Sequence, residues 1–292
     1  MSRPRSTRRT RSQVDEIRTG LFTLLEAENP MTVRQVFYRA VSEGLVEKTE
    51  TEYRATIIRL LTELRRAGAM PFGWLADSTR WQRKPRTWNS LSDALRLTAE
   101  TYRRALWSTA ESYVEVWLEK DALAGVLFEE TYTFDVPLMV TRGYPSLTFL
   151  HSAAAALSEQ RRPVFPYYFG DWDPSGRDIS RAVEKDLRAF APTAEITFER
   201  VAVNPDQIES MNLPTRPTKA TDPRGKSFRG GSVEVDAIPP LTLRKLARNR
   251  IVSHLDVREL ERLEAAEELE RETLRRFAES FECALEPRGK YL

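Results

Sequence analysis

The chain has 292 residues, enough for two domains, and its hydrophobic content of 41% is sufficient to build folded cores. Charged residues make up 30%, and no apolar run approaches the length of a membrane span, which predicts a cytoplasmic protein. The single cysteine excludes an internal disulfide framework, and with only two histidines it argues against a zinc site built by this chain alone.

Basic residues are gathered in three separate segments, which the net charge of +2 conceals. The first is residues 1–12, which are expected to form a disordered basic arm. The second lies among tryptophans and contains Arg83, Lys84 and Arg86. The third is a Pro/Gly-rich loop that contains Lys226. Each segment could contact the phosphates of a nucleic acid or could be a solvated part of the surface, and both interpretations are open.

The first part of the chain has the periodicity of three short helices. Apolar residues recur at helical spacing in three segments: residues 12–28, 33–43 and 51–67. Thr32 is suited to cap the second helix. The turn-rich run at residues 70–77 is predicted to form a β-ribbon. Three helices followed by a ribbon is the order of a winged-helix domain, which we assign to residues 13–90; this fold usually binds DNA, although it also serves in protein contacts.

A linking helix and an alternation of strands and helices follow. Residues 91–112 are predicted to connect the two domains. Beyond them, the predicted strands are residues 114–118, 136–141, 164–169 and 195–203, and the predicted helices are residues 121–130, 145–159 and 175–190. This alternation predicts an α/β domain at residues 113–240 with a mostly parallel sheet. With a helical segment predicted at residues 241–292, the chain is expected to be a multidomain α/β protein.

Three acidic residues follow the ends of two predicted strands. Glu119 comes directly after the first strand, and Asp171 and Asp173 come after the third. Because strand ends of a parallel sheet point into one crevice, these carboxylates are expected to converge, and they would repel one another without a cation between them. Oxygen-only ligation suits Mg²⁺, with Mn²⁺ as an alternative, and a phosphate ester is the expected substrate. The plainer interpretation is a turn in which Asp173 caps the next helix, but the combination with Glu119 favours a metal.

Three further polar residues are candidates for supporting this site. Lys120 follows Glu119 directly and either neutralises a phosphate or pairs with a neighbouring acid. Glu234 and Asp236 alternate along a strand-like run at residues 232–238, so they are expected to share one face. They either support the metal from a second layer of contacts or lie on an exposed strand face, and the sequence favours neither interpretation.

Arg34 and Tyr38 lie four residues apart on the second predicted helix and are therefore neighbours on one face. A phenol titrates near ~10 and is a poor nucleophile at neutral pH. A nearby guanidinium stabilises the phenolate and also binds phosphate, so this pair is chemically competent for transesterification at a phosphodiester. The spacing is common, however, and the alternative is a half-buried packing role for Tyr38.

Four segments of the chain, taken in order, carry a family resemblance. They are Thr32-Val33-Arg34-Gln35-Val36-Phe37-Tyr38, Val116-Trp117-Leu118-Glu119-Lys120-Asp121, Arg142-Gly143-Tyr144-Pro145-Ser146 and Gly170-Asp171-Trp172-Asp173-Pro174-Ser175-Gly176. Together they span about residues 12–240 and resemble the A subunit of type IIB topoisomerases (topoisomerase VI) and the related meiotic double-strand-break transesterase. The resemblance implies a winged-helix domain that carries the attacking tyrosine, followed by a Toprim domain with a Rossmann-like parallel sheet.

The resemblance also implies a role for each candidate residue. Tyr38 would attack DNA and form a 5′-phosphotyrosyl link, with Arg34 assisting it. The residues implied to hold Mg²⁺ are Glu119, Asp171 and Asp173. In that family the tyrosine of one protomer works with the metal site of the other, which implies a homodimer on duplex DNA. The basic residues expected to contact this DNA are Arg39, Arg83, Lys84, Arg86, Arg142 and Lys226. Such a protein would be cytoplasmic and associated with the nucleoid.

Two features set the chain apart from the topoisomerase VI pattern. It contains no Gly-x-x-x-x-Gly-Lys-Ser/Thr loop and no other ATPase signature, so ATP-driven strand passage would need a separate ATPase partner. It is also compact, which resembles the single-protein group called Topo mini-A, known mainly from phages and plasmids. We therefore predict Mg²⁺-dependent DNA cleavage through a covalent tyrosine adduct, with rejoining of the strands left open.

Two alternatives to transesterification are open. The chain also resembles the Toprim nuclease subunit of Wadjet-type plasmid-defence systems, and that kinship would favour plain hydrolysis with no covalent role for Tyr38. The other alternative is a non-catalytic DNA-binding protein with a vestigial site. Trapping protein covalently attached to DNA would separate the first alternative from the tyrosine route.

Overall fold

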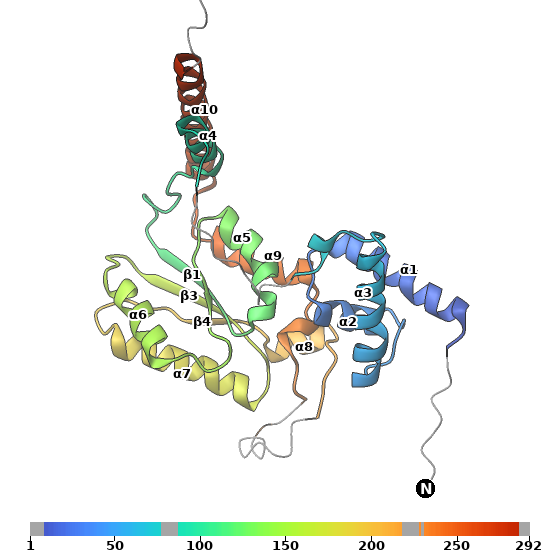
Figure 1. Cartoon of the computed structure of the whole chain (residues 1–292). Helices are drawn as coiled ribbons and strands as arrows, with labels where there is room; N and C mark the ends of the chain where they lie inside the picture. Colours follow the sequence, from blue (N-terminus) through green and yellow to red (C-terminus); the bar gives the residue numbers. More distant parts are fainter. Residues whose placement is uncertain (1–8, 77–86, 218–227, 229–230, 286–292) are drawn as a thin grey trace, which may run out of the picture.

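The N-terminal part of the chain is a cluster of helices (Figure 1). The computed structural model describes residues 9–76, 87–217, 228 and 231–285. The first elements are α1, Arg11–Glu28; α2, Val33–Ser42; a π-helical segment, Glu52–Ile58; and α3, Arg59–Arg66. Thr10 and Thr32 begin α1 and α2 with capping boxes, in which each threonine hydroxyl accepts from a backbone N–H and a glutamine three residues later returns the contact. The three predicted helices are confirmed, although the third begins as a π-helix.

The β-ribbon predicted at residues 70–77 is wrong for the part that the structure describes. Phe72–Trp74 is a short 3-10 helix, and Leu75 makes only an isolated parallel bridge to Met31. Pro71 has no N–H to donate to a sheet partner, which disfavours a ribbon here. Residues 77–86 lie outside the described residues. The assignment of residues 13–90 to a winged-helix domain therefore stays a prediction.

The disordered arm predicted at residues 1–12 is wrong at its C-terminal end. Thr10 caps α1, and the Arg9 guanidinium forms an ion pair with Glu52 at 2.8 Å. Arg9 also donates to the hydroxyl of Thr56 at 3.0 Å. These contacts hold the start of α1 against the π-helical segment, and residues 1–8 lie outside the described residues.

A four-stranded parallel sheet forms the second part of the fold (Figure 1). Its strands are β1, Tyr113–Leu118; β2, Leu138–Val140; β3, Val164–Phe169; and β4, Glu199–Ala202. They pair in the order β2-β1-β3-β4, and every pairing is parallel. The predicted α/β class with a parallel sheet is confirmed. The strands predicted at residues 136–141 and 195–203 are shorter than expected, and Pro137 explains the late start of β2 because it has no N–H.

Helices cover both faces of the sheet, and alternate strand residues serve the two faces. Val116 and Leu118 of β1 belong to a core shared with α5 and α9, whereas Trp117 between them belongs to a second core with α6 and α7. The sheet is thus buried on both sides, as parallel sheets usually are. The helices of this part are α5, Ala124–Thr133; α6, Leu147–Ser158; α7, Pro174–Phe190; α8, Pro205–Ser210; and α9, Pro240–Val252.

The strand order creates a switch point between β1 and β3. The chain passes from β1 to β2 on one side and then crosses to β3 on the other side of β1. The connections that leave the two strands therefore run in opposite directions, and the carboxyl ends of β1 and β3 flank the place where ligands bind in open α/β sheets. The candidate acids Glu119 and Asp171 follow these two ends.

A stalk of two helices projects from the sheet (Figure 1). It consists of α4, Leu91–Thr101, packed along α10, Val257–Leu285. The linking helix predicted at residues 91–112 is too long, because Tyr102 leaves the helix and donates its hydroxyl to Glu270 of α10 at 2.7 Å. None of the described helices is both long and apolar enough to cross a membrane.

The helical segment predicted at residues 241–292 is two helices in the described part of the chain. α9 ends at Val252 and α10 begins at Val257. The break places His254 against the sheet, where its ring nitrogens contact the hydroxyls of Ser112 at 2.9 Å and Tyr167 at 2.6 Å. The local sequence pattern favours one continuous helix. The contacts of His254 with Ser112 and Tyr167, which are distant in the sequence, favour a turn instead.

Glu115 is a buried acid in the middle of β1. The residue is 2% exposed, and its carboxylate accepts hydrogen bonds from the Trp117 indole at 2.8 Å and the Tyr113 hydroxyl at 3.2 Å. Burial raises the pKa of Glu115 to about 7, and these two hydrogen bonds offset part of that rise. Between the unfolded pKa of 4.5 and about pH 7, the folded state therefore binds a proton on Glu115 that the unfolded chain has lost.

Replacing Glu115 with glutamine is expected to stabilise the fold at neutral and alkaline pH but not at acid pH. Because the folded pKa is raised, the ionised carboxylate destabilises the protein as the pH rises from the unfolded value through about 7. Glu115→Gln should raise the free energy of unfolding by about 3 kcal/mol near pH ~8 and leave it nearly unchanged near pH ~4. Thermal melts at both pH values measure this change in stability, and Glu264→Gln at an exposed position is the control. An equal stabilisation by Glu115→Gln at the two pH values would contradict the expectation.

Candidate functional site

Glu119 and Asp171 adjoin at the switch point of the sheet. The backbone N–H of Glu119 donates to the carbonyl of Phe169 at 2.9 Å, which extends the pairing of β1 and β3 by one residue. The Oε2 atom of Glu119 accepts from the backbone N–H of Asp171 at 3.2 Å and from the Tyr168 hydroxyl at 3.3 Å. The structure therefore brings the first acid against the turn that carries the other two.

Asp171 and Asp173 have different local partners. The Oδ1 atom of Asp171 accepts from the backbone N–H of Val235 at 2.8 Å, which ties the turn after β3 to the segment that carries Glu234. Asp173 is the N-cap of α7, and its Oδ1 atom accepts from the N–H of Gly176 at 2.7 Å. The capping role that the sequence left open for Asp173 is thus present. Gly176 packs so closely on the carbonyl of Asp171 that a Cβ atom there would clash with it.

The acids at this edge are hard to ionise in the free chain. Burial, followed by repulsion from Asp171, raises the pKa of Glu119 to about 7. Burial also raises the pKa of Asp171 to about 6, although the Lys120 ammonium opposes that rise. Buried carboxylates in excess of their cationic partners are costly, so binding of a cation at this position would stabilise the fold.

The donor chemistry at this edge fits a hard cation, since oxygen-only ligation suits Mg²⁺ or Mn²⁺. The arrangement is incomplete: among the residues that the structure describes, no group of three or more His, Cys, Asp or Glu residues is placed to hold a metal ion. Glu119 and Asp171 are adjacent, while Asp173 is engaged as a helix cap. The Mg²⁺ site therefore stays a prediction, in which Asp173 would contribute the oxygen that does not cap α7.

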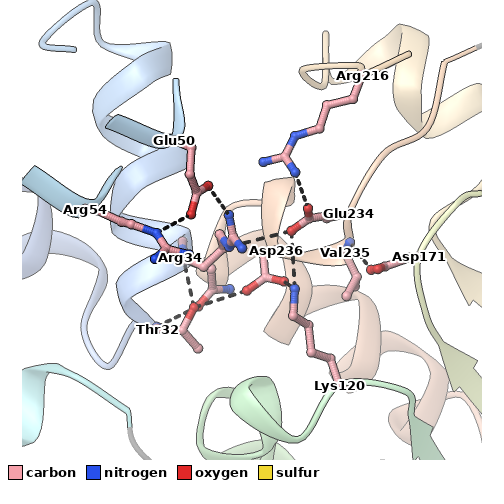
Figure 2. Close-up of polar contacts among 11 residues, drawn as sticks. Thr32, Arg34, Glu50, Arg54, Lys120, Asp171, Arg216, Glu234, Val235 and Asp236 are labelled. Carbon is pink, nitrogen blue, oxygen red and sulfur yellow. Dashed lines mark hydrogen bonds and ion pairs between the residues drawn. The ribbon is translucent and has the colours of Figure 1, made fainter. Parts of the chain in front are cut away.

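Lys120 pairs with two acids from a distant segment (Figure 2). Its ammonium forms a close ion pair with Asp236, whose side chain is fully buried, and another with Glu234 at 3.3 Å. Asp236 also accepts from the hydroxyl of Thr32, the cap of α2, at 3.2 Å. This network joins the end of β1 to the helix that carries Tyr38.

The strand predicted at residues 232–238 is wrong. Val233 forms an isolated antiparallel bridge with Trp172, and Val235–Ala237 is a short 3-10 helix. Glu234 and Asp236 nevertheless reach the same lysine. Their shared direction therefore comes from the bridge and the turn that follows it rather than from the pleat of a strand.

Tyr38 lies on α2 among several cations. The residue is 2% exposed, and the ammonium of Lys48 and the guanidinium of Arg216 each lie 5.6 Å from the centre of its ring. Burial raises the pKa of Tyr38 well above its usual value, Glu234 raises it further, and Arg216 and Arg34 oppose this rise. The phenol is therefore protonated and enclosed in this conformation.

Arg34 extends from α2 towards the same network (Figure 2). Its guanidinium lies 4.5 Å from the centre of the Tyr53 ring, and its Nε atom is 3.8 Å from Glu234. The predicted proximity of Arg34 and Tyr38 on one helix is consistent with the influence of this guanidinium on the phenol pKa. The helix that carries the candidate nucleophile is thus linked to the acid-bearing segments.

The residues predicted to contact DNA differ in their surroundings. Arg39 forms ion pairs with Glu28 at 2.8 Å and Glu43 at 3.3 Å, so it supports the packing of α1 on α2. Arg142 has a side chain that is 66% exposed, and it pairs with Asp121 at 3.2 Å. The other four lie outside the described residues: Arg83, Lys84, Arg86 and Lys226.

Three basic residues of the site were missed by the sequence analysis. Lys48 and Arg216 flank Tyr38, and Lys48 also donates to the carbonyl of Thr215 at 2.9 Å. Arg200 of β4 donates to the carbonyls of Gly170 and Asp171 and so holds the turn that carries the acids. Arg200 is a charged residue inside a predicted strand, and this position could have marked it as a candidate. Apart from their charge, Lys48 and Arg216 have no feature in the sequence that indicates a role in the site.

Comparisons with known proteins do not assign the chain. No protein-family model matches the sequence, and no curated protein matches it.

Proposed function

We propose that this chain cleaves DNA by Mg²⁺-dependent transesterification to Tyr38, acting as a homodimer. The observation that supports this most is the convergence of cations on the Tyr38 ring, together with the ion pairs that link its helix to the acids after β1 and β3. A phosphodiester next to a phenol needs such cations, because both the phosphate and the developing charge are anionic.

Each group has a defined part in this proposal. Arg34, Lys48 and Arg216 would bind the phosphodiester and lower the pKa of the phenol once Glu234 no longer lies beside it. Glu119, Asp171 and Asp173 would hold Mg²⁺. When bound, the metal would stabilise negative charge on the phosphate and on the departing oxygen. The phosphotyrosyl bond that forms replaces the phosphodiester bond that breaks, so the strand could be rejoined without ATP.

We further propose that α1–α3 and the loop after them form a winged-helix domain and that the sheet with its helices forms a Toprim domain. The switch-point position of the acids and the capped helix α2 before the sheet support this assignment. Duplex DNA would then lie across the exposed basic side chains near the site, such as Arg142, with little base-specific contact. Strand passage would need a separate ATPase partner, and the protein would associate with the nucleoid.

Hydrolysis is the second candidate, and the burial of Tyr38 favours it. A nucleophile that is 2% exposed, with a raised pKa, cannot attack DNA without a rearrangement around it. Water could instead attack a phosphate held at the acidic edge, with Tyr38 serving only as packing. The acidic edge would be required in both cases, so the two candidates differ only in the nucleophile.

Covalent trapping tests the proposed function. Purified protein is incubated with supercoiled plasmid and Mg²⁺, quenched with detergent, and divided into samples with and without protease. We expect broken plasmid whose ends carry protein until the protease removes it, and intact plasmid when EDTA is added first. Broken ends free of protein would show hydrolysis, and intact plasmid in every sample would contradict both candidates.

A further inference from the structure

The carboxylate of Glu234 lies among cations from three parts of the chain (Figure 2). Its Oε1 atom accepts from Arg216 at 2.6 Å, and its Oε2 atom lies 3.3 Å from the Lys120 ammonium and 3.8 Å from the Nε atom of Arg34. These cations lower the pKa of Glu234 despite its burial, so it is held as an anion. The single Glu234 carboxylate is thus shared by three cations. These cations could instead bind an anion that has more oxygen atoms than a carboxylate.

Arg34 is incompletely satisfied by this carboxylate. Its Nη1 atom is buried and has no hydrogen-bond partner among the described residues. Its ion pairs, at 3.8 Å to Glu234 and 3.9 Å to Glu50, are too long for hydrogen bonds. The stacking on Tyr53 nevertheless fixes the position of the guanidinium. A buried donor without an acceptor is costly, and its presence points to an acceptor group that binds here.

The charge balance of the cluster also favours an additional anion. Five cations meet there, and four carboxylates oppose them: Arg34, Lys48, Arg54, Lys120 and Arg216 against Glu50, Asp171, Glu234 and Asp236. If the Glu234 carboxylate moved away, the local excess of positive charge would rise from one to two. The side chains of Arg34, Lys120 and Arg216 are 27%, 30% and 38% exposed, so a ligand can reach them from solvent.

We propose that these cations form a phosphate-binding site that Glu234 occupies in the free protein, and that a nucleic-acid phosphate displaces the Glu234 carboxylate on binding. A guanidinium binds carboxylate and phosphate oxygens with the same geometry, so the two ligands are mutually exclusive. The nucleic-acid origin of the phosphate rests on the proposed function. The site lies beside the Tyr38 ring, so displacement of Glu234 would remove the carboxylate that helps to raise the pKa of the phenol.

DNA binding without cleavage tests this site. A fluorescent duplex of about thirty base pairs, the size of three helical turns, is titrated with protein in EDTA over a range of salt concentrations. Glu234→Gln should tighten binding about tenfold and make the logarithmic salt dependence steeper by up to about one unit. The matched control is Glu264→Gln on the exposed face of α10, which changes the net charge equally. Equal effects of the two variants would overturn the proposal.

A second variant shows whether the gain uses the cations of the site. Adding Arg216→Ala to Glu234→Gln should abolish the tighter DNA binding that Glu234→Gln alone produces. Arg216 is chosen because it makes the shortest contact to the Glu234 carboxylate. A gain that persists would contradict the proposal. Thermal melts confirm that each variant folds. Inorganic phosphate is titrated in the same melts: if it raises the midpoint of Glu234→Gln while duplex affinity stays unchanged, the site takes free phosphate and the nucleic-acid assignment is wrong.

The proposed function and this site can fail separately. The binding measurement contains no metal and no cleavage step, so it can succeed even if no covalent adduct is ever trapped. If adduct forms with the wild-type chain and Glu234→Gln binds DNA no more tightly than Glu264→Gln, the phosphate site is wrong while the proposed function stands.

Discussion

Tyr38→Phe is expected to abolish the covalent protein–DNA adduct, lowering its yield by more than about a thousandfold. The substitution removes the only atom that could form the phosphotyrosyl bond. It keeps the ring, which packs against Phe37 with centroids 5.5 Å apart, so the melting temperature should change little. The measurement is the fraction of plasmid DNA that retains protein after a detergent quench.

The control for this experiment is Tyr132→Phe, a tyrosine of α5 that is 52% exposed. It should form adduct at the wild-type level. If Tyr38→Phe breaks DNA at the wild-type rate with free ends, hydrolysis replaces transesterification as the function. Tyr38 would then be a packing residue, as its burial by itself suggests.

The conformation seen here is closed with respect to this chemistry. Tyr38 is enclosed, and Glu234 lies among the cations that a phosphodiester would need. Burial is the larger cause of the raised pKa of the phenol, and the Glu234 carboxylate raises it further. Movement of the segment that carries Glu234 would therefore free the cations and remove one of the causes that raise the pKa of Tyr38.

The sequence predicts the sheet better than it predicts the site. The third strand is found at residues 164–169 as expected, and β1 begins one residue before the predicted start at 114. Short buried runs of β-branched and aromatic residues carry this signal locally. Glu119 and Asp171 were placed correctly at adjoining strand ends for the same reason, since the ends of parallel strands meet.

The remaining parts of the site depend on contacts between distant residues. The hydrogen bond from Lys48 to Thr215 joins positions 167 residues apart, and the ion pair of Lys120 with Glu234 joins positions 114 residues apart. Hydrophobic periodicity contains no information on such contacts. It also predicted a strand at residues 232–238, where a bridge to Trp172 and a 3-10 turn place the acids instead.

Asp171→Asn is expected to lower DNA cleavage by more than about a hundredfold and to stabilise the metal-free fold. The amide oxygen can still accept from the N–H of Val235, so the turn should be preserved. Because the pKa of Asp171 is raised from 3.8 to about 6 in the folded state, the protein loses stability as the pH rises through this interval, and the loss is complete above about pH 6. Its removal should therefore raise the melting temperature near pH ~7.5 and change it little near pH ~3.5, below both pKa values.

These two effects in opposite directions distinguish a ligand from a structural residue. A structural acid, once replaced, should lower stability and activity together, whereas a metal ligand that is costly in the free chain should lower activity and raise stability. Mg²⁺ should raise the melting temperature of the wild-type chain and have no effect on Asp171→Asn, with exposed Asp206→Asn behaving as wild type. Undiminished cleavage by Asp171→Asn, or an equal response of both variants to Mg²⁺, would mean that the acids at the ends of β1 and β3 do not hold the metal.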